Sequence, residues 1–301
     1  MRWLLAICAL LFAFVAEARA QGSFVAFQQP GDIGQVQVTV WVPPGYDRDT
    51  RRRYPVLYMH DGQNIFSPKR SGFNKVWAAD KAALQLIRAR KVAPFLIVAV
   101  DHPGEARFLR YFPTRVVSAP FAQGIEKHAK GKLAGDDYLR FLADTLKPVI
   151  DKRFRTRPHP RHTAVAGSSM GGLISLYALS ERADVFGKAA AVSTHSPLID
   201  PDLLARQPDM AAAVKADWTR YLSARLGAPQ GRKLWMDHGT ETLDASYAPY
   251  QAVLDTGVAK AGWVRGKDFE TRVYQGTPHE ENAWAARLPE ILGWLLSDWR
   301  P

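Results

Sequence analysis

The pentapeptide Gly167-Ser168-Ser169-Met170-Gly171 most constrains what this chain can fold into. An apolar run over residues 163–166 precedes it, and an apolar-periodic run over residues 173–179 follows it. This pattern predicts a buried strand, a sharp turn and a helix, and the small glycines let the strand and helix backbones approach closely. A strand–turn–helix around G-x-S-x-G is typical of a nucleophile elbow, in which a strained backbone exposes the central serine. Ser169 is therefore the candidate nucleophile.

A serine hydroxyl at neutral pH needs a general base, and the base needs a carboxylate to orient it, in the chain order Ser, acid, His. Three histidines follow the elbow, namely His195, His238 and His279. His279 suits the role of base best. It lies in a loop between the alternating run 269–274 and a C-terminal segment with apolar residues at helical spacing. Such a loop can return an imidazole to the elbow.

The candidate acids lie in one stretch, residues 234–244, just after the preceding predicted strand. Asp244 is the expected acid, and Glu241 is the alternative. Asp237 is less suitable because it lies within or at the end of the strand, where a side chain has little freedom to reach a neighbouring loop. The competing interpretation of Asp244 is a carboxylate that caps a helix starting near residue 245.

These residues and several other segments resemble the esterase family of the α/β-hydrolases, which holds esterase D, enterochelin esterases, feruloyl esterases and the antigen 85 mycolyltransferases. The resemblance covers nearly the whole chain after residue 20. It implies an α/β-hydrolase fold, with a mostly parallel central sheet and helices on both faces. The segments that carry it are the elbow and residues 58–64, 97–100, 138–154, 184–187, 239–247 and 279–284.

The family also implies an oxyanion hole built from two backbone amides, which fall on Met170 and Gln63. Such amides stabilise the charge that develops on the carbonyl oxygen during acyl transfer. The competing interpretation of residues 61–64 is an ordinary turn, because Asp, Gly and Asn are common turn residues.

Residues 107–113 depart from the family's pattern. Many members carry an Arg-x-x-Glu-Tyr-x-Pro-like segment there, and in this chain the acidic position is Arg110. Arg107 and Arg110 are candidate substrate-binding residues, and Arg110 favours an anionic substrate because arginine binds carboxylates bidentately. A solvent-facing Arg110 is an equal alternative. His195 is a further candidate for the substrate pocket, with a capping or surface role as its alternative.

The spacing of apolar residues predicts alternating strands and helices, which indicates a largely parallel sheet with helices on both faces. Strands are expected over 36–42, 55–59, 95–100, 163–166, 189–192 and 269–274, and helices over 76–87, 136–150 and 200–226. The candidate site residues run from Gln63 to His279 and must converge. Residues 21–301 are therefore expected to form a single domain.

Residues 1–20 combine a charged start, a short apolar core and the small-x-small end Ala18-Arg19-Ala20. This is typical of a signal peptide cut after Ala20, so a periplasmic or secreted protein is expected, with an uncleaved anchor as the alternative. The only cysteine, Cys8, lies in this segment. No later apolar run reaches membrane-spanning length, and no integral membrane association is expected.

The net charge is +11, and basic clusters lie at residues 51–53, 127–132 and 152–157. Acids are interspersed and no recognised nucleic-acid motif is present, so no nucleic-acid partner is expected. His159 and His162 have no neighbouring cysteine or carboxylate that would complete a metal set, and neither a metal nor a cofactor is expected.

The sequence therefore predicts an exported serine esterase that forms an acyl-enzyme on Ser169. Its substrate is expected to be a small-molecule or polysaccharide-linked ester, such as a siderophore or feruloyl-type ester. Two alternatives stay open. One is an acyltransferase on the same residues, in which an alcohol outcompetes water. The other is a catalytically silent binding protein of the same fold.

Overall fold

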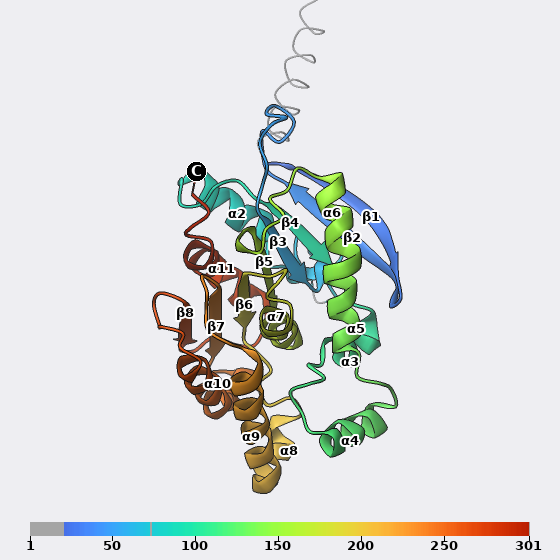
Figure 1. Cartoon of the computed structure of the whole chain (residues 1–301), viewed down its shortest axis with the longest axis vertical. Coiled ribbons are helices and arrows are strands. Elements are labelled where there is room, and N and C mark those ends of the chain that lie inside the picture. Colours follow the sequence, from blue (N-terminus) through green and yellow to red (C-terminus); the bar gives the residue numbers. More distant parts are fainter. Residues whose placement is uncertain (1–20, 73, 301) are drawn as a thin grey trace, which may run out of the picture.

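An eight-stranded sheet runs through the residues that the computed structural model describes, 21–72 and 74–300 (Figure 1). The predicted signal peptide, with Cys8 and the cut after Ala20, lies outside these residues. The strand order is β1-β2-β4-β3-β5-β6-β7-β8. The strands are β1 (Ser23–Gly31), β2 (Gly34–Val42), β3 (Val56–His60), β4 (Leu96–Val100), β5 (Thr163–Ser168), β6 (Lys188–Val192), β7 (Lys233–Gly239) and β8 (Phe269–Tyr274).

The sheet is mostly parallel, as predicted. Strands β4, β3, β5, β6, β7 and β8 pair in parallel, and only the hairpin β1–β2 and the β2–β4 pair are antiparallel. The central strands β3, β4, β5 and β6 are buried at every position. Burial on both faces explains why these strands read as continuous apolar runs in the sequence.

Helices cover both faces of the sheet, and each face has its own apolar core. Along β5, Val165 belongs to one core, whereas Ala164 and Ala166 belong to the other, as the two-residue period of a strand requires. One face carries α2 (Ala79–Arg88) and α11 (Glu281–Leu295). The other carries α3 (Arg107–Tyr111), α5 (Gly135–Arg140), α6 (Lys147–Arg153), α7 (Met170–Glu181), α9 (Pro208–Arg225) and α10 (Ala248–Lys260).

Several elements differ from the sequence-based expectations. The helix expected over 200–226 is two helices, α8 (Pro201–Arg206) and α9, because Pro208 forces Gln207 out of the helical region. The helix expected over 136–150 contains a π-helical turn, Phe141–Leu146, and continues as α6. The sequence analysis missed β1 and α4 (Ala119–Ala129), and the helix expected to start near residue 245 begins at Ala248 as α10. Within the described part of the chain, no helix is long and apolar enough to cross a bilayer.

The fold brings five loops together at one edge of the sheet. Because the strands from β3 to β8 run in parallel, their carboxyl ends lie at the same edge, where open α/β sheets bind their ligands. The loops that follow β3, β5, β6, β7 and β8 contain most of the candidate site residues, and segments more than 200 residues apart in the chain meet there, as the contact between Asn64 and Glu281 shows.

Candidate active site

Ser169 occupies the turn between β5 and α7 in a strained conformation. Its φ is 58° and its ψ −121°, a region that residues with a side chain rarely adopt. Three backbone hydrogen bonds hold it: Ser169 N donates to Val192 O at 3.0 Å, and Ser169 O accepts from Leu173 N at 3.1 Å and from His195 N at 3.2 Å. The approach is close, because a Cβ at Gly172 would lie 2.7 Å from Thr194 Oγ1. This geometry leaves Ser169 partly exposed above the sheet.

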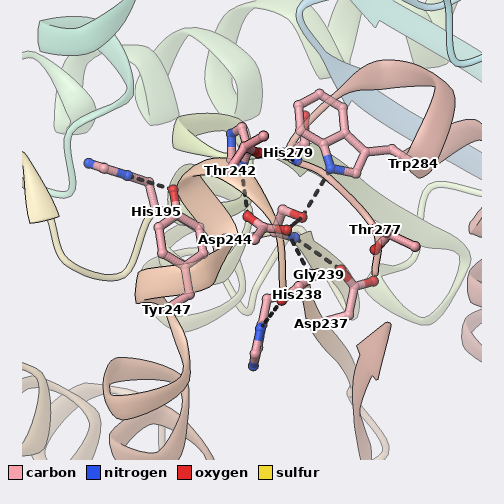
Figure 2. A network of polar contacts seen from close by, with 12 residues as sticks. His195, Asp237, His238, Gly239, Thr242, Asp244, Tyr247, Thr277, His279 and Trp284 are labelled. Carbon is pink, nitrogen blue, oxygen red and sulfur yellow. Dashed lines mark hydrogen bonds and ion pairs between the residues drawn. The ribbon is translucent and has the colours of Figure 1, made fainter. Parts of the chain in front are cut away.

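His279 is hydrogen-bonded to Asp244, with 2.6 Å between His279 Nδ1 and Asp244 Oδ1 (Figure 2). Asp244 lies in the short 3₁₀ helix η5 (Thr242–Ser246) after β7, and His279 lies between β8 and α11. The imidazole packs between Tyr247 and Trp284, with ring centroids 5.7 and 5.0 Å away. The alternative acid, Glu241, is exposed and makes no side-chain hydrogen bond to His279 among the described residues. The structure therefore brings Asp244, and not Glu241, to the imidazole.

The second carboxylate oxygen of Asp244 is also occupied. Asp244 Oδ2 accepts hydrogen bonds from Ser193 Oγ and from Gly239 N, both at 2.6 Å. Burial alone would raise the pKa of Asp244, but the bonds from His279, Ser193 and Gly239 together lower it below its usual value. Asp244 does not cap a helix, since α10 begins at Ala248 without a side-chain cap. The carboxylate is held ionised in one orientation.

Behind Asp244 lies a buried polar group of side chains from three elements. Ser193 Oγ accepts hydrogen bonds from Trp284 Nε1 at 3.0 Å and from Arg287 Nη2 at 2.7 Å. Arg287 also forms an ion pair with Asp237 at 2.7 Å, and the two side chains are 3% and 0% exposed. The carboxylate of Asp237 therefore pairs with Arg287, whereas His279 pairs with Asp244.

The sequence analysis missed Ser193 and Arg287. A signal for Arg287 is present: it follows Trp284 by three residues and precedes Ile291 by four, so a charge falls on the apolar face of α11. A charge at such a position is buried, and a buried charge needs a partner.

Ser169 and His279 line one cavity of about 510 Å³, here called the polar cavity. Among the described residues, no hydrogen bond joins the Ser169 hydroxyl to His279, and this contact is often long before substrate binds. The Ser169 hydroxyl instead contacts the Tyr247 hydroxyl, which is hydrogen-bonded to His195 Nδ1 at 2.7 Å. The lining also includes Asp61, Lys75, Trp77, Arg107, Glu280 and Trp284.

The two amides expected to form an oxyanion hole lie at the starts of helices. Met170 is the first residue of α7, and Gln63 is the second residue of the 3₁₀ helix η1 (Gly62–Asn64). Amides at these positions have no acceptor within their own helix, so both are available to a ligand. Gly62 makes the loop possible, because a Cβ there would lie 2.6 Å from Asp101 Oδ1.

The two candidate arginines have different surroundings. Arg107 lines the polar cavity, and its Nε and Nη2 donate to both oxygens of Asp61 at 2.6 and 2.7 Å. Its charge is thus largely neutralised by a bidentate partner. Arg110 is half-buried and donates to the Ile33 carbonyl at 2.8 Å, and it does not line the polar cavity. The Arg110 guanidinium thus contacts the β1–β2 turn, and its role in substrate binding stays a prediction.

His195 stands beside Ser169 and lines a neighbouring cavity. Burial, with His279 and Arg107 nearby, lowers its pKa to about 4, so its ring is neutral at pH 7. Over residues 21–72 and 74–300, no group of three or more His, Cys, Asp and Glu side chains is arranged to hold a metal ion.

Comparison with known sequences gives one family and partial relatives. The family model described as "Putative esterase" matches residues 34–295. The uncharacterized protein YbbA of Bacillus subtilis is 24% identical over 160 residues, which are 53% of this chain and 57% of YbbA. An endo-1,4-beta-xylanase/feruloyl esterase of Xylanibacter ruminicola is 29% identical over 167 residues, 51% of this chain and 19% of that protein. The chain thus spans less than two thirds of either relative.

Solved structures share the fold over most of the chain. A ferulic acid esterase has 18% identity and a TM-score of 0.61, covering 92% of this chain and 98% of its own. An IroE-like serine hydrolase from Shewanella oneidensis has 17% identity and a TM-score of 0.65, covering 90% and 79%. The siderophore hydrolase EstB from Aspergillus nidulans has 19% identity and a TM-score of 0.61, covering 92% and 96%. The predicted α/β-hydrolase fold is confirmed.

Proposed function

The chain belongs to the family described as "Putative esterase", and from this premise we propose that it is an exported serine hydrolase of carboxylic esters. The observation that carries the proposal is the hydrogen bond from His279 to the buried Asp244, at a cavity into which a strained turn presents Ser169. A nucleophile, a base and an orienting acid in one place are what acyl transfer through a serine requires.

In the first half of the reaction, Ser169 Oγ attacks the ester carbonyl while His279 Nε2 removes the hydroxyl proton. Asp244 keeps the proton of the neutral imidazole on Nδ1, so that Nε2 is free to accept, and it stabilises the imidazolium that forms. The amides of Met170 and Gln63 donate to the oxyanion, and each such donor contributes roughly 3 kcal/mol to the transition state.

In the second half, the His279 imidazolium protonates the leaving alcohol, and an acyl group stays on Ser169. Water then enters, His279 removes its proton, and hydrolysis releases the acid and the free serine.

Domain organisation and export belong to the same proposal. The family match and the continuous sheet support one esterase domain over residues 21–301. The sequence of residues 1–20 supports a signal peptide and export to the periplasm or the medium. The likeness to an endo-1,4-beta-xylanase/feruloyl esterase and to a siderophore hydrolase supports a small-molecule or polysaccharide-linked ester as substrate.

The test is hydrolysis of p-nitrophenyl acetate and butyrate by the protein and by Ser169→Ala, with mass spectrometry after treatment with a fluorophosphonate probe. We expect turnover and an adduct on Ser169. Both should be lost in the variant, with kcat lower by roughly 10³-fold or more. Full activity in folded Ser169→Ala protein would refute the assignment of the nucleophile. No turnover and no adduct in the folded wild type would favour a silent binding protein.

A further inference from the structure

A second cavity, of about 650 Å³, lies beside the polar cavity. It opens between α4 on one side and α8 with the start of α9 on the other, and Figure 1 shows α4 standing away from the sheet opposite these helices. We call it the apolar cavity, because most of its lining side chains are hydrophobic, including Phe108, Phe121, Ile125, Leu203 and Met210.

Ser169 lines the polar cavity, and residues next to it in space line the apolar cavity. Arg107 lines the polar cavity with Ser169, and the next residue along α3, Phe108, lines the apolar cavity. His195 also lines the apolar cavity, and its backbone N–H donates to the Ser169 carbonyl at 3.2 Å. A group bonded to Ser169 can therefore extend to either side.

The position of His279 decides which part of an ester goes to which side. His279 must protonate the alcohol oxygen as it leaves, so the alcohol lies on the side of the imidazole. His279 lines the polar cavity and not the apolar one. The alcohol part then lies among charged groups such as Lys75 and Glu280, and the acyl part points away from them.

We propose that the apolar cavity binds the acyl group, and that the substrates are esters joining a bulky apolar acid to a polar alcohol. This inference rests on the proposed esterase function. A volume of about 650 Å³ is in the usual range for ligand sites and far exceeds an acetyl group, which occupies the space of a few waters of about 30 Å³ each. Each buried methylene should raise kcat/KM roughly fourfold.

Gly124 offers a way to fill the cavity without disturbing the fold. It lies on α4, lines the cavity, and a Cβ there would meet nothing within 4 Å. Gly124→Leu should fit, and it should strengthen the helix, because glycine is a poor helix former. The matched control is Gln123→Leu, which places the same side chain at an exposed position of the same helix that does not line the cavity.

The experiment compares kcat/KM for p-nitrophenyl acetate, butyrate and octanoate in the wild type, Gly124→Leu and Gln123→Leu. The wild type should prefer octanoate over acetate by at least about tenfold. Gly124→Leu should lower the ratio of kcat/KM for octanoate to kcat/KM for acetate about tenfold, and Gln123→Leu should keep the wild-type ratio. Calorimetry with octanoate and the Ser169→Ala protein should likewise show binding that Gly124→Leu weakens.

The outcomes separate this inference from the proposed function. If the wild type turned over none of these esters, the proposed esterase function would be refuted, and the acyl assignment with it. Ser169-dependent acetate hydrolysis combined with an octanoate rate that Gly124→Leu does not change would overturn the acyl assignment alone. An effect of Gly124→Leu on octyl acetate, but not on p-nitrophenyl octanoate, would also overturn it, because the cavity would then hold the alcohol.

Discussion

The two flanks of Ser169 are built in opposite ways. On one flank is the acid cluster, defined as Asp237, Asp244, Ser193, Trp284 and Arg287, in which every side chain is buried and both carboxylates are paired. On the other flank is the α4 wall, defined as residues 115–134. Within α4 only Ile125 is buried, and the wall is tied at its start by Ser118 N donating to Asp217 Oδ2 at 3.1 Å.

This difference indicates that the acid cluster serves proton transfer, whereas the α4 wall serves substrate selectivity. Proton transfer needs His279 within a fraction of an ångström of its place, and buried charge-assisted hydrogen bonds in a low-dielectric interior supply that precision. An apolar wall needs only approximate shape, so a weakly held helix suffices, and it can change in sequence at little cost in stability. We expect substitutions in the acid cluster to affect catalysis and folding, and those in the α4 wall to affect selectivity.

The largest effect should come from Asp244→Asn. The amide cannot hold the proton of His279 on Nδ1 or stabilise the imidazolium, so kcat should fall by roughly 10³-fold or more while KM changes little. Steady-state kinetics with p-nitrophenyl butyrate measures this. Glu241→Gln, at an exposed site, is the matched control and should stay within about twofold of wild type. The opposite ranking would move the acid to Glu241.

The next largest effect is on stability, from Arg287→Met. It leaves Asp237 buried without its cation, and breaking a pair of this kind typically costs about 3–5 kcal/mol of the free energy of unfolding. Urea denaturation followed by fluorescence measures the change. The double variant Asp237→Leu/Arg287→Met, which also removes the stranded charge, should recover part of the loss. A loss below about 1 kcal/mol in the single variant would show that the pair does not anchor the acid cluster.

A smaller effect should appear in the pH dependence of stability. His60, behind the elbow, is 1% exposed and hydrogen-bonded to Tyr138 Oη at 2.9 Å. Burial lowers the pKa of His60 from 6.5 to about 4. The unfolded chain therefore binds a proton that the folded chain does not, and stability should fall by up to about 3 kcal/mol as the pH drops through this window.

Urea midpoints between pH 7.5 and 4.5 test the role of His60. His60→Asn should reduce the slope but not abolish it, because burial also lowers the pKa of His195 to about 4, whereas His128→Asn, at an exposed position on the α4 wall, should leave the slope unchanged. Equal slopes in the wild type and His60→Asn would contradict the assignment of the pH dependence to this buried imidazole.

The smallest effect should come from Asp217→Ala, which removes one of the contacts at the start of the α4 wall. The variant loses the bond from Ser118 N and an ion pair with Arg220, whose side chain is 53% exposed. Exposed pairs and single hydrogen bonds contribute little, so the loss of unfolding free energy should be about 1 kcal/mol or less, with acetate hydrolysis unchanged. If Asp217→Ala lost as much unfolding free energy as Arg287→Met, the two flanks of Ser169 would not differ in how firmly they are held.

Much of the fold could be predicted because its signals are local. The buried central strands read as apolar runs, and the elbow combines a strand, glycines and a helix within a few residues. The misses have local causes too. Strand β1 pairs at the sheet edge, but its polar end, Gln28-Gln29-Pro30, lacks the apolar pattern from which a strand is predicted. In α4, a glycine and few buried residues weaken the helical pattern.

For the site, the sequence by itself determined the candidates for the chemistry: Ser169 on its turn, His279 in a loop that returns to it, and a carboxylate after β7. Only the tertiary structure placed Asp244, and not Glu241, on the imidazole, took Arg110 to the β1–β2 turn, and joined Ser193 to Arg287, 94 residues later in the chain. The physical reason is the sequence separation between the residues that interact. Neighbouring residues decide whether a turn or a strand forms. The partner of a buried charge, in contrast, can come from any group that folding brings into the same water-free interior.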